Sequence, residues 1–169
     1  MHDMIVRQYQ SSDLKTCRHL WLHLTEWHRE IYQSPTIGGD NPGLLFDEHL
    51  GRVGAEHIWL AEIDGKVIGM TGLIPRDGEA ELEPMIVNPE YRGLGVGRHL
   101  VETVIEEATK RGWRQLQVRP VARNRQAIQF FHELGFKVLG YIELFQELKP
   151  DSKNIWIEGE QIAGRRFEI

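Results

Sequence analysis

The stretch Ile86-Val87-Asn88-Pro89-Glu90-Tyr91-Arg92-Gly93-Leu94-Gly95-Val96-Gly97 carries the most information in this chain of 169 residues. An apolar run ends at a proline, an arginine follows, and three alternating glycines lead into a segment with helical spacing of apolar residues. Glycines let backbone N–H groups approach a ligand, and a helix N-terminus adds unpaired N–H groups and partial positive charge. The stretch therefore predicts a phosphate-binding turn between a strand and a helix.

Two common phosphate-binding motifs do not fit this stretch. No Gly-Lys-Ser/Thr follows the glycines, which excludes a P-loop. The dinucleotide fingerprint requires a small residue at Arg98 when counted from Gly93, or at Leu100 when counted from Gly95. From the glycines alone, a tight strand-to-helix turn that binds nothing is an equally good interpretation.

Two motifs together resemble a known family. Residues 87–97 are similar to the acetyl-CoA signature of the GNAT acetyltransferase superfamily. A second block, Asn124-Arg125-Gln126-Ala127-Ile128-Gln129-Phe130-Phe131-His132-Glu133-Leu134-Gly135-Phe136, resembles the family's Asn-x-x-Ala…Gly-Phe segment. The blocks come in the family's order, and the clear resemblance covers residues 59 to about 148.

The resemblance implies that acetyl-CoA is the cofactor. Backbone near Met85, Ile86 and Val87 would pair with the pantetheine arm as an added strand does, and one amide would polarise the thioester carbonyl. Asn124 would cap its helix, bind the cofactor, or do both, and Phe131 would pack along the pantetheine arm. The pyrophosphate would bind backbone N–H groups, with charge-assisted contacts from two arginines; these residues are Arg92, Gly93, Leu94, Gly95, Val96, Gly97 and Arg98.

Glu81 and Glu83 are the candidate catalytic residues. A lysine-like amine has a pKa near 10.4, so only about one molecule in two thousand is the free base at pH 7. The two carboxylates alternate with Leu82 and so leave one face of a strand, and Glu81 best matches the family's general base. The simpler interpretation is two solvated carboxylates. Phe131 occupies the place of the family's proton-donating tyrosine, so the thiolate would be protonated by another group or by water.

The first long helix offers further candidates. His19, His23, Glu26 and Glu30 share one face, which we interpret as solvated rather than metal-binding, and we expect no metal. The resemblance makes Trp27, Glu30 and Tyr32 weak candidates for substrate contacts. Cys17 lies on the apolar stripe of this helix and is expected to be packed, which favours direct transfer over an acyl-cysteine.

Bulk properties narrow the class of protein. The chain is 41% hydrophobic and 27% charged, with one cysteine and no apolar run long enough to span a membrane. We expect a cytoplasmic protein without membrane segment or disulfide. A net charge of −5 disfavours nucleic-acid binding, whereas residues 91–125 hold eight basic and three acidic groups, which suits a polyanionic cofactor.

The periodicity predicts an α/β fold, a mixed and mostly antiparallel sheet with helices on both faces. Strands are expected over 4–10, 58–63, 67–73, 79–87, 115–118, 136–148 (one strand or two) and 155–157. Helices are expected over 14–31, 44–50, 98–111 and 124–134, and a turn over 149–154. We expect one acetyltransferase domain over 1–169, with a cofactor-binding core over about 80–136 and a C-terminal extension over about 150–169.

The predicted function is an N-acetyltransferase that moves an acetyl group from acetyl-CoA to a primary amine of a small molecule or peptide, directly within a ternary complex. One alternative is a non-catalytic acyl-CoA-binding sensor, which the loss of the tyrosine at Phe131 favours. Another is a nucleotide-binding protein of a different class. The extension would form a hairpin that pairs with a neighbouring subunit in a homodimer.

Overall fold

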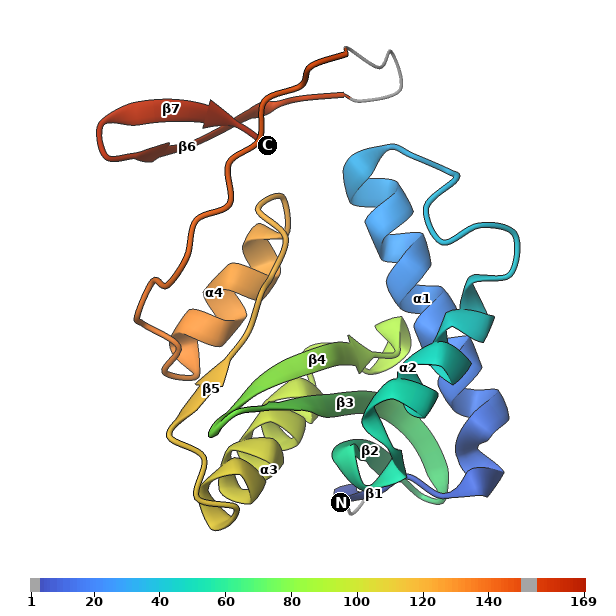
Figure 1. Ribbon diagram of the computed structural model, residues 1–169. Coiled ribbons are helices and arrows are strands. Elements are labelled where there is room, and N and C mark those ends of the chain that lie inside the picture. Colours follow the sequence, from blue (N-terminus) through green and yellow to red (C-terminus); the bar gives the residue numbers. More distant parts are fainter. Residues whose placement is uncertain (1–3, 150–154) are drawn as a thin grey trace.

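The computed structural model describes residues 4–149 and 155–169 and has a five-stranded sheet at its centre (Figure 1). The strands lie in chain order: β1 (Met4–Gln8), β2 (Ile58–Ile63), β3 (Lys66–Arg76), β4 (Glu79–Val87) and β5 (Gln115–Gln117). Pairing is antiparallel from β1 to β4, and β4 and β5 are parallel. The predicted fold class is therefore confirmed.

Turn chemistry explains the central meander. Asp64 and Gly65 both have positive φ, at 51° and 77°, between β2 and β3. A two-residue turn with both φ values positive matches the right-handed twist of antiparallel strands. Gly78, with φ of 70°, turns β3 into β4. The strong hairpin signal at Asp64-Gly65 thus produced the expected strand pair.

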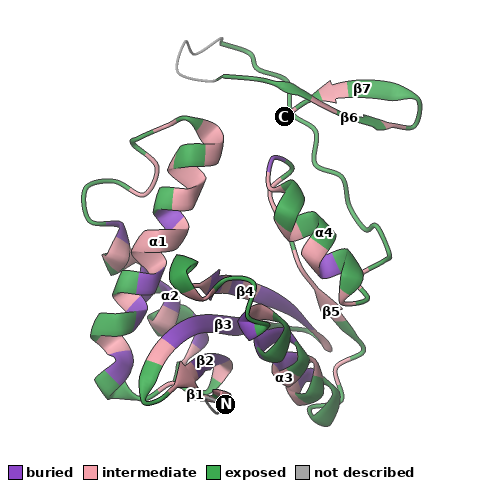
Figure 2. Cartoon of the chain, turned by 180° about the vertical axis from the view of Figure 1, so that it is seen from behind, coloured by how far each residue is buried: buried purple, intermediate pink, exposed green. Residues whose placement is uncertain are grey.

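Helices cover both faces of the sheet. Helices α1 (Leu14–Tyr32) and α2 (Leu45–Val53) pack on one face over a core that includes Leu20, Phe46 and Leu60. Helices α3 (Val96–Lys110) and α4 (Arg125–Glu133) cover the other face, where Val101 and Phe131 are buried. Figure 2 shows the central strands largely buried between these layers.

The apolar stripe predicted along α1 is buried only in its first part. Cys17 and Leu20 are 0% and 2% exposed, and Leu24 packs beside them. Trp27, farther along, lies instead beside Arg92 of the turn before α3. The C-terminal half of α1 therefore leaves the core, passes the end of β4 and rises above the sheet opposite α4 (Figure 1).

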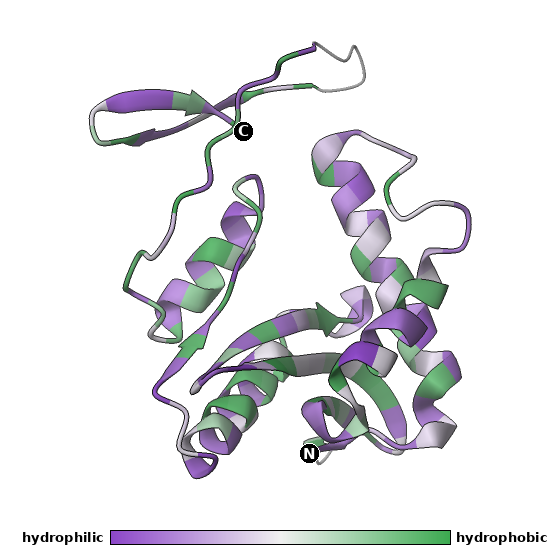
Figure 3. Cartoon of the chain, viewed as in Figure 1, coloured by the Kyte–Doolittle hydropathy of each residue, from purple (hydrophilic) through white to green (hydrophobic). Residues whose placement is uncertain are grey.

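The C-terminal region differs from the prediction. No strand forms over 136–148, where seven apolar side chains are 46% or more exposed. The strand expected at 155–157 is displaced: β6 (Glu158–Ile162) and β7 (Arg165–Glu168) form a separate antiparallel hairpin. The segment 136–148 mixes hydrophobic and hydrophilic residues (Figure 3), but no neighbouring strand pairs with it within the described ranges. The turn expected over 149–154 lies almost wholly outside the described residues.

Candidate active site

The divergence of β4 and β5 creates the site. The two strands pair only from Glu79 to Glu81 on β4 and then separate (Figure 1). On its other side, β4 stays paired with β3 up to Val87. Backbone N–H and C=O groups of β4 beyond Glu81 therefore lack a strand partner on the side of β5, and unpaired groups of this kind can pair with an extended ligand. This edge includes Met85, Ile86 and Val87, and their pairing with a pantetheine arm stays a prediction.

The glycine turn follows directly. Gly93 and Gly95 have φ of +79° and +82°, in the left-handed region that glycine adopts without strain. Helix α3 begins at Val96 with Gly95 as its N-cap residue, and no side chain caps its free N–H groups. Gly93, Leu94 and Gly95 are exposed, whereas Val96 is buried. The result is an uncovered helix N-terminus, whose N–H groups and dipole favour an anion.

Gly97 has a packing role instead. A Cβ built at this position would lie 3.0 Å from Met85 Cε and 3.1 Å from Phe130 Cζ. Only a residue without a side chain allows the first turn of α3 to approach both β4 and α4 so closely. The glycines of the motif therefore have two roles. Gly93 and Gly95 leave backbone amides exposed, and Gly97 lets α3, β4 and α4 pack closely.

Arg92 and Arg98 flank the turn. Arg92 donates from Nε to the carbonyl of Val87 at 3.4 Å, and its guanidinium lies 5.3 Å from the ring centre of Trp27. Arg98 lies beside Glu102, at 3.7 Å, on the exposed side of α3. Both cations are close in sequence to the free N–H groups, and Arg92 also connects the turn to α1.

The second motif forms the N-terminus of α4. The side chain of Asn124 accepts a hydrogen bond from the backbone N–H of Ala127 at 3.1 Å, which confirms its capping role. Phe131 is 5% exposed, and its ring packs edge-on against Phe130 and Phe136 at 5.1 and 5.5 Å. Phe131 thus belongs to the core beneath α4, and contact with a cofactor stays a prediction for both residues.

Glu81 and Glu83 lie in different surroundings. Glu81 is 4% exposed and lies between Arg76 and Arg119, whose Nε is 3.5 Å from the carboxylate. Arg119 follows β5, so this ion pair joins the two strands where they begin to separate. Glu83 is about half exposed and faces Arg52 of α2 at 3.3 Å. Glu81 is therefore not the solvated carboxylate of the simpler interpretation.

A buried histidine supports Arg52. His49 is 3% exposed, and Arg52 donates to its Nδ1 at 3.1 Å. Burial, with a smaller contribution from Arg52, lowers the pKa of His49 to about 4, so the ring is neutral at pH 7. Because arginine can only donate, the proton of the neutral ring is on Nε2, which has no partner among the described residues.

Sequence reasoning missed three residues around the site. Arg119 and Arg123 entered the prediction only as part of a basic segment, and His28 did not enter it. Arg123 is 8% exposed, lies 4.8 Å from the ring centre of Tyr32 and donates to the carbonyl of Ile31 at 3.3 Å. Nothing in a single sequence indicates that the residues after β5 meet the end of α1. Glu30, one of the weak substrate candidates, is exposed on the same helix.

Cys17 is not available as a nucleophile. Cys17 is fully buried, and burial raises the pKa of its thiol to about 12, so the nucleophilic thiolate is absent at pH 7.

Across residues 4–149 and 155–169, no group of three or more His, Cys, Asp or Glu side chains could hold a metal ion. Helices long and apolar enough to cross a membrane are likewise absent from this part of the chain.

Comparison with known proteins agrees with this geometry. The model of the acetyltransferase (GNAT) family matches residues 17–136. A probable N-acetyltransferase camello from Xenopus tropicalis is 38% identical over 82 residues, which is 47% of this chain and 37% of that protein. The uncharacterized N-acetyltransferase YjgM from Escherichia coli is 30% identical over 87 residues, covering 49% of this chain and 52% of that protein.

Solved structures share the fold. An acetyltransferase of the GNAT family from Staphylococcus aureus has a TM-score of 0.65 at 19% identity and covers 79% of this chain and 84% of its own. The aminoglycoside N-acetyltransferase AAC(6')-Iy, solved with CoA, has a TM-score of 0.63 at 21% identity and covers 88% and 97%. At these identities the likeness concerns the fold alone.

The edge of β4 separates from β5 and leads into a glycine turn, and the family model matches residues 17–136. Together these observations define the class of protein, an acyltransferase that uses acetyl-CoA. This chain belongs to the acetyltransferase (GNAT) family. The matched segments span about half or less of the curated relatives named above. The activities of those whole proteins are therefore not assigned to this chain.

Proposed function

We propose that this protein transfers an acetyl group from acetyl-CoA to a primary amine of a small molecule or peptide, directly within a ternary complex. The observation that carries the proposal is the unpaired edge of β4 ending at the exposed N-terminus of α3. The edge suits the amides of a pantetheine arm, and the helix terminus suits the pyrophosphate. The family match favours this enzyme over a non-catalytic acyl-CoA sensor.

The reaction is a displacement at the thioester carbonyl. The amine nitrogen forms a bond to the carbonyl carbon, the bond from carbon to sulfur breaks, the amine loses a proton and the CoA thiolate gains one. A backbone N–H of β4 would stabilise the negative charge that develops on the carbonyl oxygen. Direct transfer is supported by Cys17, whose buried thiol cannot serve as an acyl carrier at neutral pH.

A screen of amines tests the proposal. Purified protein is mixed with acetyl-CoA and, in turn, polyamines, amino acids, aminoglycosides, peptide N-termini and lysine peptides, and free thiol is measured. We expect thiol release that depends on one acceptor class. Binding of acetyl-CoA by calorimetry, without binding of ATP or NAD and without turnover of any amine, would instead support the sensor.

A Glu81→Gln variant tests the buried carboxylate. We propose that both carboxylates contribute to catalysis: Glu81 joins β4 to β5 through Arg119 where the strands separate, and Glu83, about half exposed, is open to the acceptor. An amide at position 81 cannot form the ion pairs with Arg76 and Arg119, so kcat/KM for the acceptor should fall at least about tenfold. Glu79→Gln, two residues earlier on the same strand, is the control. An unchanged rate in Glu81→Gln would retire its role and leave Glu83.

We further propose a homodimer formed through residues 138–148. Its side chains Val138, Leu139, Tyr141, Leu144 and Phe145 are 65% or more exposed (Figure 2). Extended apolar chain without a strand partner is a template for pairing, and the same segment on a second copy is self-complementary about a twofold axis. A standard interface buries about 800 Å² on each partner, and these five exposed apolar side chains would supply its centre.

Light scattering after size exclusion tests the dimer. Wild-type protein should elute with the mass of two chains, whereas a Tyr141→Lys and Phe145→Lys double variant should elute as a monomer, because like charges would face each other. Leu44→Lys, at a position 51% exposed on the η2 turn (Pro42–Leu44), is the control and should remain dimeric. A monomeric wild type would contradict the proposal.

A further inference from the structure

The C-terminal half of α1 faces the space between the segments that follow β4 and β5. Trp27 meets Arg92, which follows β4, at 5.3 Å, and Tyr32 meets Arg123, which follows β5, at 4.8 Å. Arg123 also donates to the backbone carbonyl of Ile31. The segments that follow β4 and β5 thus both contact the last turn and a half of α1. Inward-facing residues between Trp27 and Tyr32 therefore face the space where an acceptor would meet the thioester.

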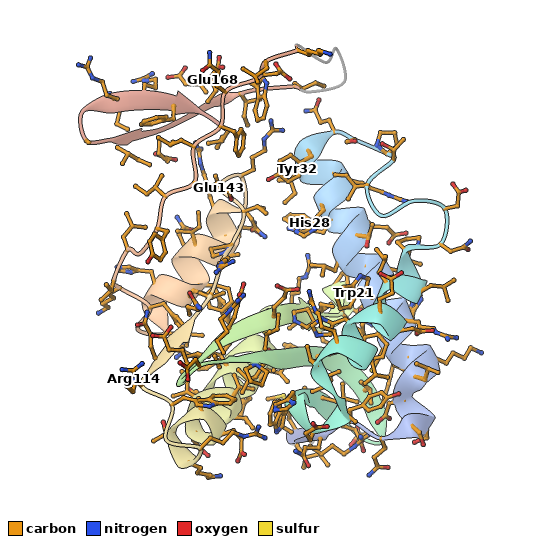
Figure 4. All side chains as sticks on the ribbon, in the orientation of Figure 1. Trp21, His28, Tyr32, Arg114, Glu143 and Glu168 are labelled. Atoms are coloured by element: carbon orange, nitrogen blue, oxygen red, sulfur yellow. The ribbon has the colours of Figure 1, made fainter. Side chains whose placement is uncertain are left out.

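His28 lies on that inner face. It lies four residues before Tyr32, so the two side chains share one side of the helix. Figure 4 shows both pointing from α1 toward α4. Arg29 points elsewhere: it donates to the carbonyls of Ile37 and Gly39 at 2.9 and 2.6 Å and so fixes the loop after the helix. His28 is partly buried, and no hydrogen bond to another described residue engages its ring.

The two carboxylates are poorly placed to take a proton. Protonation of Glu81 would weaken its pairs with Arg76 and Arg119 in a site that is 4% exposed. Glu83 would give up its pair with Arg52. His28 loses no such partner, and its burial lowers its pKa, so its ring is neutral at pH 7 and offers an electron pair.

We propose that His28 accepts the proton of the acceptor amine, directly or through one water molecule, and this rests on the transferase activity proposed above. As the nitrogen bonds to the carbonyl carbon and sulfur leaves, the amine proton passes to the imidazole. The imidazolium then returns the proton to the CoA thiolate or to water. Charged and titratable groups on the facing elements are Arg92, Arg123 and Glu143, the last lying on the α4 side in Figure 4; Tyr32, Glu26 and Glu30 belong to α1 itself.

His28→Gln and His28→Ala test the proposal. Both should lower kcat/KM for the acceptor about 10²-fold or more, the contribution of a positioned base, without changing the Kd of acetyl-CoA. The wild-type profile of kcat/KM against pH should show an acid limb below the ordinary histidine pKa of about 6.5, which both variants lack. Added imidazole should partly restore the His28→Ala enzyme. His19→Gln, on the same helix and stacked on His23, is the control.

The outcomes separate this inference from the proposed function. Wild-type kcat/KM and an intact acid limb in His28→Gln would overturn the role of His28 and leave the transferase standing. A loss confined to acetyl-CoA affinity, or to thermal stability measured by circular dichroism, would overturn it as well. A wild type that releases no thiol with any amine would overturn both.

Discussion

A Gly95→Asp variant is expected to bind acetyl-CoA about 100-fold more weakly than the wild type, equivalent to about 2.8 kcal/mol. Gly95 is the N-cap of α3 and has φ of +82°. Aspartate tolerates this conformation better than most residues with side chains, and its carboxylate would accept hydrogen bonds from the free N–H groups that otherwise bind the pyrophosphate. The variant should therefore fold while its own side chain competes with the cofactor. Isothermal titration calorimetry with acetyl-CoA measures the change.

Gly112→Asp provides the matched control. Gly112 follows the other end of α3, has φ of +72° and has open space around it, so the backbone demand is the same and the phosphate site is distant. This control should bind acetyl-CoA with wild-type affinity. Equal weakening in both variants, or none in Gly95→Asp, would show that the cofactor does not use this helix terminus.

A Phe46→Ala variant should lose about 3–5 kcal/mol of unfolding free energy, the usual cost of removing a fully buried aromatic ring. Phe46 is 0% exposed and packs against Tyr9 and Trp21, with ring centres 5.8 and 6.1 Å away. Its ring joins α1, α2 and the residue that follows β1, and a cavity there would loosen the base from which α1 extends toward the site. Urea unfolding followed by tryptophan fluorescence measures the loss.

Leu44→Ala, two positions earlier and 51% exposed, is the control for Phe46→Ala and should cost little. A loss of less than about 1 kcal/mol in Phe46→Ala would mean that α2 packs differently from the structure. Because Phe46 does not line the diverging strands, acetyl-CoA affinity should be retained at temperatures where the variant is folded.

Local patterns determined much of the fold. Asp64-Gly65 specified a turn that only residues tolerant of positive φ adopt readily, and it set the register of β2 and β3. Period-3.6 spacing located α1 and α3, and the capping chemistry of Asn124 located the start of α4. The glycine motif indicated both the exposed turn before α3 and the family, because its pattern depends on consecutive backbone amides.

The tertiary structure decided what depends on residues distant in the chain. Alternation indicated that Glu81 leaves the same face as Glu83, but Arg76 of β3 and Arg119, which follows β5, approach it and leave it buried. The segment 136–148 has strand composition, yet strands require partners, and the described fold supplies none. His28 gained its place across the opening only because Trp27 and Tyr32 meet arginines about 65 and 90 residues away. A sequence encodes backbone chemistry locally, whereas the surroundings of a side chain arise from packing between distant segments.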